Sequence, residues 1–151
     1  MQTFLPHPSF SESAIVLDRA RLGKQRVEAY QIIRTLTGVT SGWRNHPAVR
    51  MWNGHLPLLR QYLGHILAEW QSLGYRTSAA ILAERSPPLY LEPYSAIPWW
   101  LGNEQFHAAH RSNLLRKDPV WYGQYGWTEP DNLPYLWPGS KPGEFRKGTK
   151  P

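Results

Sequence analysis

The sequence contains no cysteine, and this absence excludes disulfide bonds, thiolate catalysis and cysteine-ligated zinc. It also lacks an uninterrupted apolar run of about 20 residues, the length that a helix needs to cross a bilayer. The segment MQTFLPHPSF carries neither the basic nor the apolar region of a signal peptide. We therefore expect a soluble, cytoplasmic protein that makes no membrane contact.

Acidic residues are scarce as well. Eleven Asp and Glu stand against 17 Lys and Arg, which gives a formal charge of +6. No acidic residue lies between Glu28 and Glu69. Four arginines fall in that interval: Arg34, Arg44, Arg50 and Arg60. One part of the molecule should therefore carry a positive field, which suits a polyanionic partner such as DNA.

Apolar residues recur at helical spacing over most of the chain, whose 151 residues are the size of one domain. Helices are predicted to begin at Ser11, to span residues 17–38, 47–74 and 77–84, and to run from an Asn103 cap to about Lys117. We expect Gly23 to kink or split the second helix. Gly54 and Pro57 should break the early part of the third.

The C-terminal third is rich in Trp, Tyr, Pro and Gly, and no alternating run in it predicts a sheet. Residues 86–100 read as an irregular connector. The predicted architecture is all-α: a compact single-domain helical bundle over residues 1–138, which includes a long aromatic-rich C-terminal coil. Residues 139–151 are expected to form a basic flexible tail.

A first cluster of charged residues lies within nine positions: Asp18, Arg19, Arg21, Lys24 and Arg26. Such a run is either a solvated helix face or a surface for DNA phosphates. On a helical wheel Lys24 and Glu28 point away from the apolar stripe, whereas Gln25 and Arg26 lie at its edge. A partly buried Arg26 needs a partner, either a carboxylate elsewhere or a phosphate.

A second cluster comprises His107, His110 and Arg111, whose spacing lets them share one surface of a helix. They form either a catalytic or DNA-binding site or, alternatively, hydrogen bonds within the core. Two histidines give a metal ion only two ligands, so we expect no metal site. Glu104 is a helix stabiliser or a reserve catalytic carboxylate.

Aromatic residues crowd the same third of the chain: Trp99, Trp100, Trp121, Tyr122, Tyr125, Trp127, Tyr135 and Trp137. Most of them must belong to the core, because a small bundle needs large anchors. One or two, interleaved with Arg111, Arg116 and Lys117, are expected to stack on DNA bases. Trp121 is the candidate.

The stretch Pro119 to Gly126 reads P-x-W-Y-x-x-Y-G, and Arg26 is followed by Val27 in an early helix. Further blocks are QTFLP, LGKQRVEA, GWRNHPAV, HRSNLLRKDP and DNLPYLWP. Over most of the first 138 residues the chain thus resembles the pyrimidine-dimer DNA glycosylases of phages and bacteria. The resemblance implies an all-α enzyme that bends DNA, flips a nucleotide and cleaves its N-glycosidic bond without a metal or cofactor.

The resemblance also implies a nucleophilic α-amine, exposed by removal of the initiator Met, and an assisting glutamate. Here the bulky Gln2 should keep Met1 in place, and alignment on Arg26 puts Gly23 at the position of the glutamate. The candidate catalytic residues are therefore substitutes: Asp18 first and Glu28 second as carboxylates, Lys24 as a Schiff-base amine, and His107.

The first hypothesis is a monomeric DNA glycosylase that removes a damaged or modified pyrimidine from double-stranded DNA, in repair or in phage defence, with or without lyase activity. The alternatives are a non-catalytic DNA-binding module of the same fold and a histidine-dependent nuclease. The predicted DNA-binding residues are Arg19, Arg21, Gln25, Arg26, Arg44, His46, His110, Arg111, Lys117 and Trp121.

Overall fold

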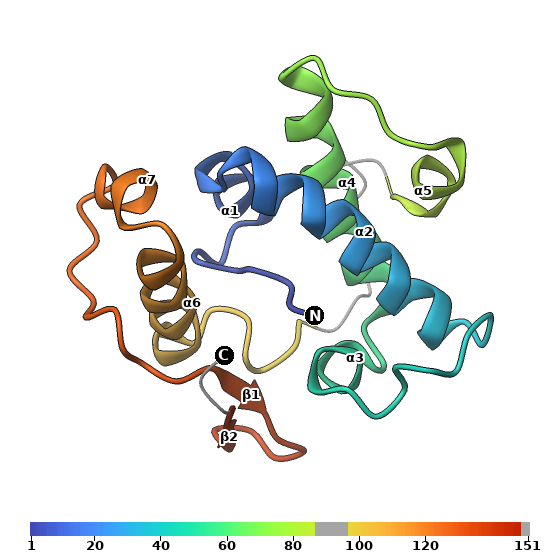
Figure 1. Ribbon diagram of the computed structural model, residues 1–151. Coiled ribbons are helices and arrows are strands. Elements are labelled where there is room, and N and C mark those ends of the chain that lie inside the picture. Colours follow the sequence, from blue (N-terminus) through green and yellow to red (C-terminus); the bar gives the residue numbers. More distant parts are fainter. Residues whose placement is uncertain (87–96, 149–151) are drawn as a thin grey trace. The chain divides into compact units, whose positions relative to one another are not determined.

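The computed structural model describes residues 1–86 and 97–148 (Figure 1). Most of these residues are helical, which confirms the predicted fold class. They divide into two units: Met1–Thr3 with Leu17–Ala96, and Phe4–Val16 with Ile97–Pro151, each taken over its described residues. The single domain of residues 1–138 stays a prediction. Most of the predicted connector, residues 87–96, lies outside the described residues.

Unit 1 contains four helices in its described residues: α2 (Arg19–Leu36), α3 (Pro47–Trp52), α4 (Leu56–Ser72) and α5 (Ala79–Glu84). Helices α2 and α4 pack side by side, and α3 and α5 contact α2 (Figure 1). The core between them is formed by residues with no exposed surface: Leu22, Ala29, Ile32, Ile33, Leu59, Leu63, Ile66 and Leu67. Burial stabilises the fold by about 1.5–3 kcal/mol for each large aliphatic side chain.

Of the two forms predicted at Gly23, a split into two helices is wrong, because α2 is continuous from Arg19 to Leu36. Gly23 instead makes room for the indole ring of Trp70 on α4. A Cβ atom added at Gly23 would lie 3.0 Å from the nearest ring carbon of Trp70. The glycine therefore serves close helix packing, which a pattern read along one helix cannot reveal.

The predicted break between α3 and α4 is confirmed. Gly54 lies between them with φ of 82°, a left-handed conformation that favours glycine. Pro57 falls in the first turn of α4, where its missing N–H costs no helical hydrogen bond. Helix α5 begins at Ala79, capped by the Ser78 hydroxyl, slightly later than predicted.

Unit 2 contains, in its described residues, α1 (Phe10–Val16), α6 (Glu104–Lys117), α7 (Pro119–Gly123), β1 (Leu136–Pro138) and β2 (Phe145–Lys147). The α6 prediction is confirmed at both ends. The side-chain oxygen of Asn103 accepts a hydrogen bond from the Phe106 N–H at 3.2 Å, which caps the helix. Helix α1 begins one residue before the predicted Ser11.

The expectation of no sheet is wrong at the C-terminal end. Strands β1 and β2 form an antiparallel pair, with Leu136 opposite Lys147 and Pro138 opposite Phe145. Three residues on each strand are too few for an alternating pattern to stand out. Strand β2 thus lies in the segment expected to be a flexible tail, while α7 lies in the predicted coil. Across residues 1–86 and 97–148, no helix is long and apolar enough to span a bilayer.

Candidate active site

A polar cluster surrounds the first residues of the chain in unit 1. We call it the N-terminal cluster and define it as Gln2, Thr3, Gln25, Glu28, Trp52 and Tyr62. Five of its members are buried, and the side chain of Glu28 retains 12% of its exposed surface. Buried polar groups of this kind need partners, and the cluster supplies them internally.

A chain of hydrogen bonds holds the Glu28 carboxylate. The Tyr62 hydroxyl donates to the Gln25 side-chain oxygen at 2.7 Å. The Gln25 amide nitrogen donates to Glu28 Oε2 at 3.3 Å, and the Gln2 backbone N–H donates to the same oxygen at 3.1 Å. Because both donors reach one carboxylate oxygen, they fix the orientation of the side chain. Lys24 Nζ lies 4.0 Å from the other oxygen, Oε1.

Two further bonds fasten the start of the chain. Trp52 Nε1 on α3 donates to the Thr3 hydroxyl at 2.9 Å, and the Thr3 N–H donates to the Gln2 side-chain oxygen at 2.9 Å. Thr3 and Trp52 have no exposed surface. The first residues are therefore part of the packed interior of unit 1.

His46 lies at the N-terminus of α3, where its Nδ1 accepts a hydrogen bond from the Ala48 N–H at 3.0 Å. Burial lowers the pKa of His46, and the positive charge of the Met1 amine lowers it further. Both effects favour the neutral form of the His46 ring.

The other predicted carboxylate, Asp18, has a different position. It caps α2 by accepting a hydrogen bond from the Arg21 N–H at 3.4 Å, and its Oδ1 lies 3.1 Å from Arg21 Nη1. Gly23, the position that the resemblance gives to the assisting glutamate, lies under the Trp70 ring. Of these three positions, Glu28 is the one in the N-terminal cluster.

A stack of aromatic rings and guanidinium groups lies along α2. The Arg26 guanidinium lies 4.8 Å from the Trp70 ring centroid, and that of Arg19 lies 4.7 Å from the Tyr75 ring centroid. The two rings are themselves 4.5 Å apart. Arg26 Nη1 also donates to the Thr77 hydroxyl at 2.6 Å. We call these residues the arginine stack.

The arginine stack corrects one expectation about Arg26. Within the described residues a ring face and a hydroxyl contact Arg26 in place of the predicted carboxylate, while the alternative partner, a phosphate, stays a prediction. Burial lowers the pKa of Arg26. Its Nε has no hydrogen-bond partner within the described residues. Of the remaining predicted residues of unit 1, Lys24 and Arg44 are exposed.

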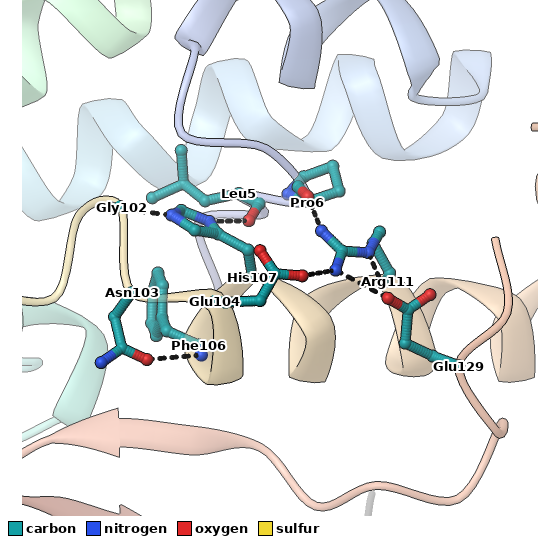
Figure 2. Close-up of polar contacts among 9 residues, drawn as sticks. All are labelled: Leu5, Pro6, Gly102, Asn103, Glu104, Phe106, His107, Arg111 and Glu129. Carbon is teal, nitrogen blue, oxygen red and sulfur yellow. Dashed lines mark hydrogen bonds and ion pairs between the residues drawn. The ribbon is translucent and has the colours of Figure 1, made fainter.

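Unit 2 contains the second predicted cluster, on α6 (Figure 2). His107 Nε2 accepts a hydrogen bond from the Gly102 N–H at 2.9 Å, so Nδ1 carries the proton and donates to the Leu5 carbonyl oxygen at 2.7 Å. His110 Nδ1 accepts from the Leu5 N–H at 2.9 Å. Burial, followed by the charges of His107 and Arg111, lowers the pKa of His110 to about 3.

Arg111 completes this cluster. Its Nη1 donates to the Pro6 carbonyl oxygen at 2.8 Å and its Nε to Glu129 at 2.7 Å, while Nη2 pairs with Glu104 (Figure 2). Burial alone would lower the pKa of Arg111, but the hydrogen bonds to Glu129 and Glu104 raise it. His107, His110 and Arg111 are all buried, and their bonds hold Leu5 and Pro6 against α6.

The last two predicted DNA contacts lie at the end of α6 and in α7. Lys117 is exposed in the final turn of α6. Trp121 is 39% exposed, and its Nε1 donates to the Val16 carbonyl oxygen at 2.8 Å. Trp121 therefore both anchors α7 to α1 and presents part of its ring to solvent. Among the described residues, no group of three His, Cys, Asp or Glu side chains could hold a metal ion.

The comparisons with known proteins give one match. A family model described as pyrimidine dimer DNA glycosylase matches residues 1–82, which is more than half of the chain. The matched segment includes every residue of the N-terminal cluster and of the arginine stack, and it ends before the motif at Pro119–Gly126. No curated protein and no solved structure matches the chain.

Proposed function

Because the chain belongs to the pyrimidine dimer DNA glycosylase family, we propose that it flips a damaged or modified pyrimidine out of duplex DNA and excises it, leaving an abasic site. The observation that carries this proposal is the Glu28 carboxylate, which Gln2 and Gln25 hold in the matched segment. Double-stranded DNA with a lesion or modified base is the proposed partner, and the protein acts as a monomer.

Glu28 is assigned the role of the catalytic carboxylate. When the N-glycosidic bond breaks, the base leaves with the bonding electron pair and takes up a proton, while positive charge develops on the sugar. A fixed carboxylate stabilises that charge, and it accepts the proton that a water molecule loses as it adds to C1′. Its orientation is set before substrate binds, because Gln2 and Gln25 donate to the same oxygen.

Lys24 is assigned to a lyase step, if the reaction includes one. Its ε-amino group lies 4.0 Å from Glu28 and its side chain is 74% exposed. An amine that adds to C1′ in place of water forms a Schiff base, and β-elimination then nicks the strand. Borohydride traps such an intermediate as a covalent complex, and peptide mapping assigns the amine to Lys24 or to Met1. Excision with no trapped complex would show a purely hydrolytic reaction.

The cations of unit 1 are proposed to contact the DNA backbone. Arg19 and Arg26 have guanidinium groups already supported by aromatic rings, so less side-chain freedom is lost when a phosphate binds. Arg44 lies in the interval without acidic residues. These contacts position the duplex and carry no base specificity of their own.

The decisive experiment is a panel of duplexes that carry a thymine photodimer, different modified pyrimidines or no lesion. Excision is read as alkali-labile strand breaks on a denaturing gel. We expect Glu28→Gln to lower the excision rate by about 100-fold or more, with DNA affinity unchanged. The matched control is Glu12→Gln, an exposed glutamate on α1. Wild-type excision by Glu28→Gln would reject this catalytic assignment.

A second candidate is a non-catalytic DNA-binding module of the same fold. It is favoured by Gly23, because the position assigned to the assisting glutamate is a glycine packed against Trp70. Binding to the duplexes without base release on any of them would establish this candidate. For either candidate function, the proposed biological setting is the cytoplasm, where the protein takes part in DNA repair or in defence against phages with modified DNA. The lesion that is preferred separates these two settings.

A further inference from the structure

The loop between α2 and α3 exposes a large aromatic side chain. Trp43 is 49% exposed, and Val39 in the same loop is 63% exposed. A tryptophan can bury about 150–250 Å² when it packs, so half-exposure leaves much of that stabilisation unused. The ring is therefore available to an external partner.

Trp43 is nevertheless held in place. Its carbonyl oxygen accepts a hydrogen bond from the His46 N–H at 2.8 Å, which closes a turn. The Trp43 ring also meets the His46 ring edge-on, with centroids 5.8 Å apart and planes at 73°. Since His46 caps α3 through Ala48, the indole ring is supported by a helix terminus. Little conformational freedom remains to be lost when it binds.

The surroundings of Trp43 are basic. Arg44 and Arg50 are exposed, and no acidic residue lies between Glu28 and Glu69. Asn45 Oδ1 accepts a hydrogen bond from Arg50 Nη2 at 3.4 Å, which steadies the loop. A half-exposed aromatic ring in a basic segment matches a nucleic acid, because bases stack on the ring while phosphates pair with the cations.

The loop also connects to the N-terminal cluster through α3. His46, which contacts the Trp43 ring, caps α3 at its N-terminus. Trp52, at the other end of this six-residue helix, donates a hydrogen bond to Thr3 of the cluster. One short helix therefore links the Trp43 loop to the cluster that holds Glu28.

We propose that Trp43 inserts into the base stack of duplex DNA beside the flipped nucleotide, where it stacks on a neighbouring base and fills the vacated space. Removal of a base from the stack is unfavourable, and an aromatic wedge offsets part of that cost. The inference rests on the proposed function and deepens it, because it assigns the residue that opens the duplex.

The first test compares double-stranded and single-stranded substrates that carry the same lesion. Trp43→Ala should lower kcat/KM on the duplex by about 10-fold or more, since stacking on one base is of that strength. It should leave excision from the single strand unchanged, because no stack has to be opened there. Trp43→Phe should retain most activity. The control is Val120→Ala, which removes an 88% exposed apolar side chain on α7.

A second measurement does not depend on catalysis. Fluorescence anisotropy gives the affinity for a duplex with a tetrahydrofuran abasic analogue relative to an intact duplex, and Trp43→Ala should reduce this preference by about 10-fold. If the wild type excises no base but its preference for the abasic duplex still depends on Trp43, the proposed glycosylase activity is rejected and the proposed insertion of Trp43 is supported. If Trp43→Ala matches the wild type in both assays, or loses activity equally on single strands, the inference is overturned.

Discussion

At the scale of single residues, Glu28 depends on groups that come from three separate parts of unit 1. Gln25 lies one turn away on α2, Tyr62 belongs to α4, and Gln2 lies at the start of the chain. Tyr62 does not contact the carboxylate but orients the amide that does. It is therefore a positioning residue in the proposed mechanism, and it has no exposed surface.

Tyr62→Phe is expected to lower kcat more than it raises KM. The change leaves the buried Gln25 oxygen without this donor, which should cost about 1–3 kcal/mol of stability and loosen the amide that holds Glu28. Steady-state kinetics and urea unfolding measure the two effects. Tyr30→Phe, on α2, is the control and should change neither. A purely structural Tyr62 would lower stability without altering kcat.

Glu28 also shows where prediction from sequence stopped. The helical wheel predicted that Glu28 points away from the apolar stripe of α2, yet its side chain is only 12% exposed. The cover comes from Gln2, which is 26 positions away in sequence. Periodicity along one helix carries no information about such a distant contact. On sequence alone, Asp18 therefore ranked above Glu28 as the candidate catalytic carboxylate. Thr3, Trp52 and Tyr62 gave no polar signal, because their residue types are equally common in ordinary packing.

At the scale of elements, capping and chain-breaking residues in the sequence predicted the helix boundaries well. They did not predict contacts between elements that are distant in sequence. Asn103 predicted the start of α6, and Gly54 with Pro57 predicted the break before α4, because capping and chain-breaking act within a few residues. The β1–β2 pair was missed, since each strand is short. Gly23 was misread as a break, because its reason lies in Trp70 on another helix.

Helix α6 also gives a prediction about pH. His110 has a pKa of about 3 in the folded state against 6.5 as its ordinary value. As pH falls below 6.5 the unfolded chain takes up this proton first, so folding stability falls, by up to about 1.4 kcal/mol per pH unit from this group. His110→Gln removes the titration while an amide oxygen can still accept from Leu5. Urea unfolding between pH 7 and 4 should therefore give a shallower slope for the variant. An unchanged slope would contradict this assignment.

At the scale of the whole molecule, the residues behind the formal charge of +6 differ in whether their charge is paired within the protein or exposed to solvent. Arg111 is buried and paired with Glu104 and Glu129, so its charge is neutralised within unit 2. Arg44 is exposed in a stretch of unit 1 without acidic residues. Total charge therefore overstates what is available to a phosphate backbone.

Arg44→Ala should weaken DNA binding and lower the slope of log affinity against log salt by about 0.9, the value for one lost phosphate contact. Arg111→Ala should instead lower the free energy of unfolding by about 3–5 kcal/mol, because it removes a buried charge from its partners, above all the nearly buried Glu129 carboxylate. Titrations at several salt concentrations, paired with urea unfolding, measure both quantities. A reduced salt slope in a folded Arg111→Ala protein would show that this residue also contacts DNA.

The contact between Gly23 and Trp70 constrains the evolution of this chain. A side chain at position 23 meets an indole ring that is itself fixed by Arg26, Tyr75 and a bond from its Nε1 to the Arg76 carbonyl oxygen. A glutamate at position 23 would require the Trp70 ring to move by a few tenths of an ångström, which would disturb the arginine stack. We therefore expect substitutions at positions 23 and 70 to be coupled in their effect on stability.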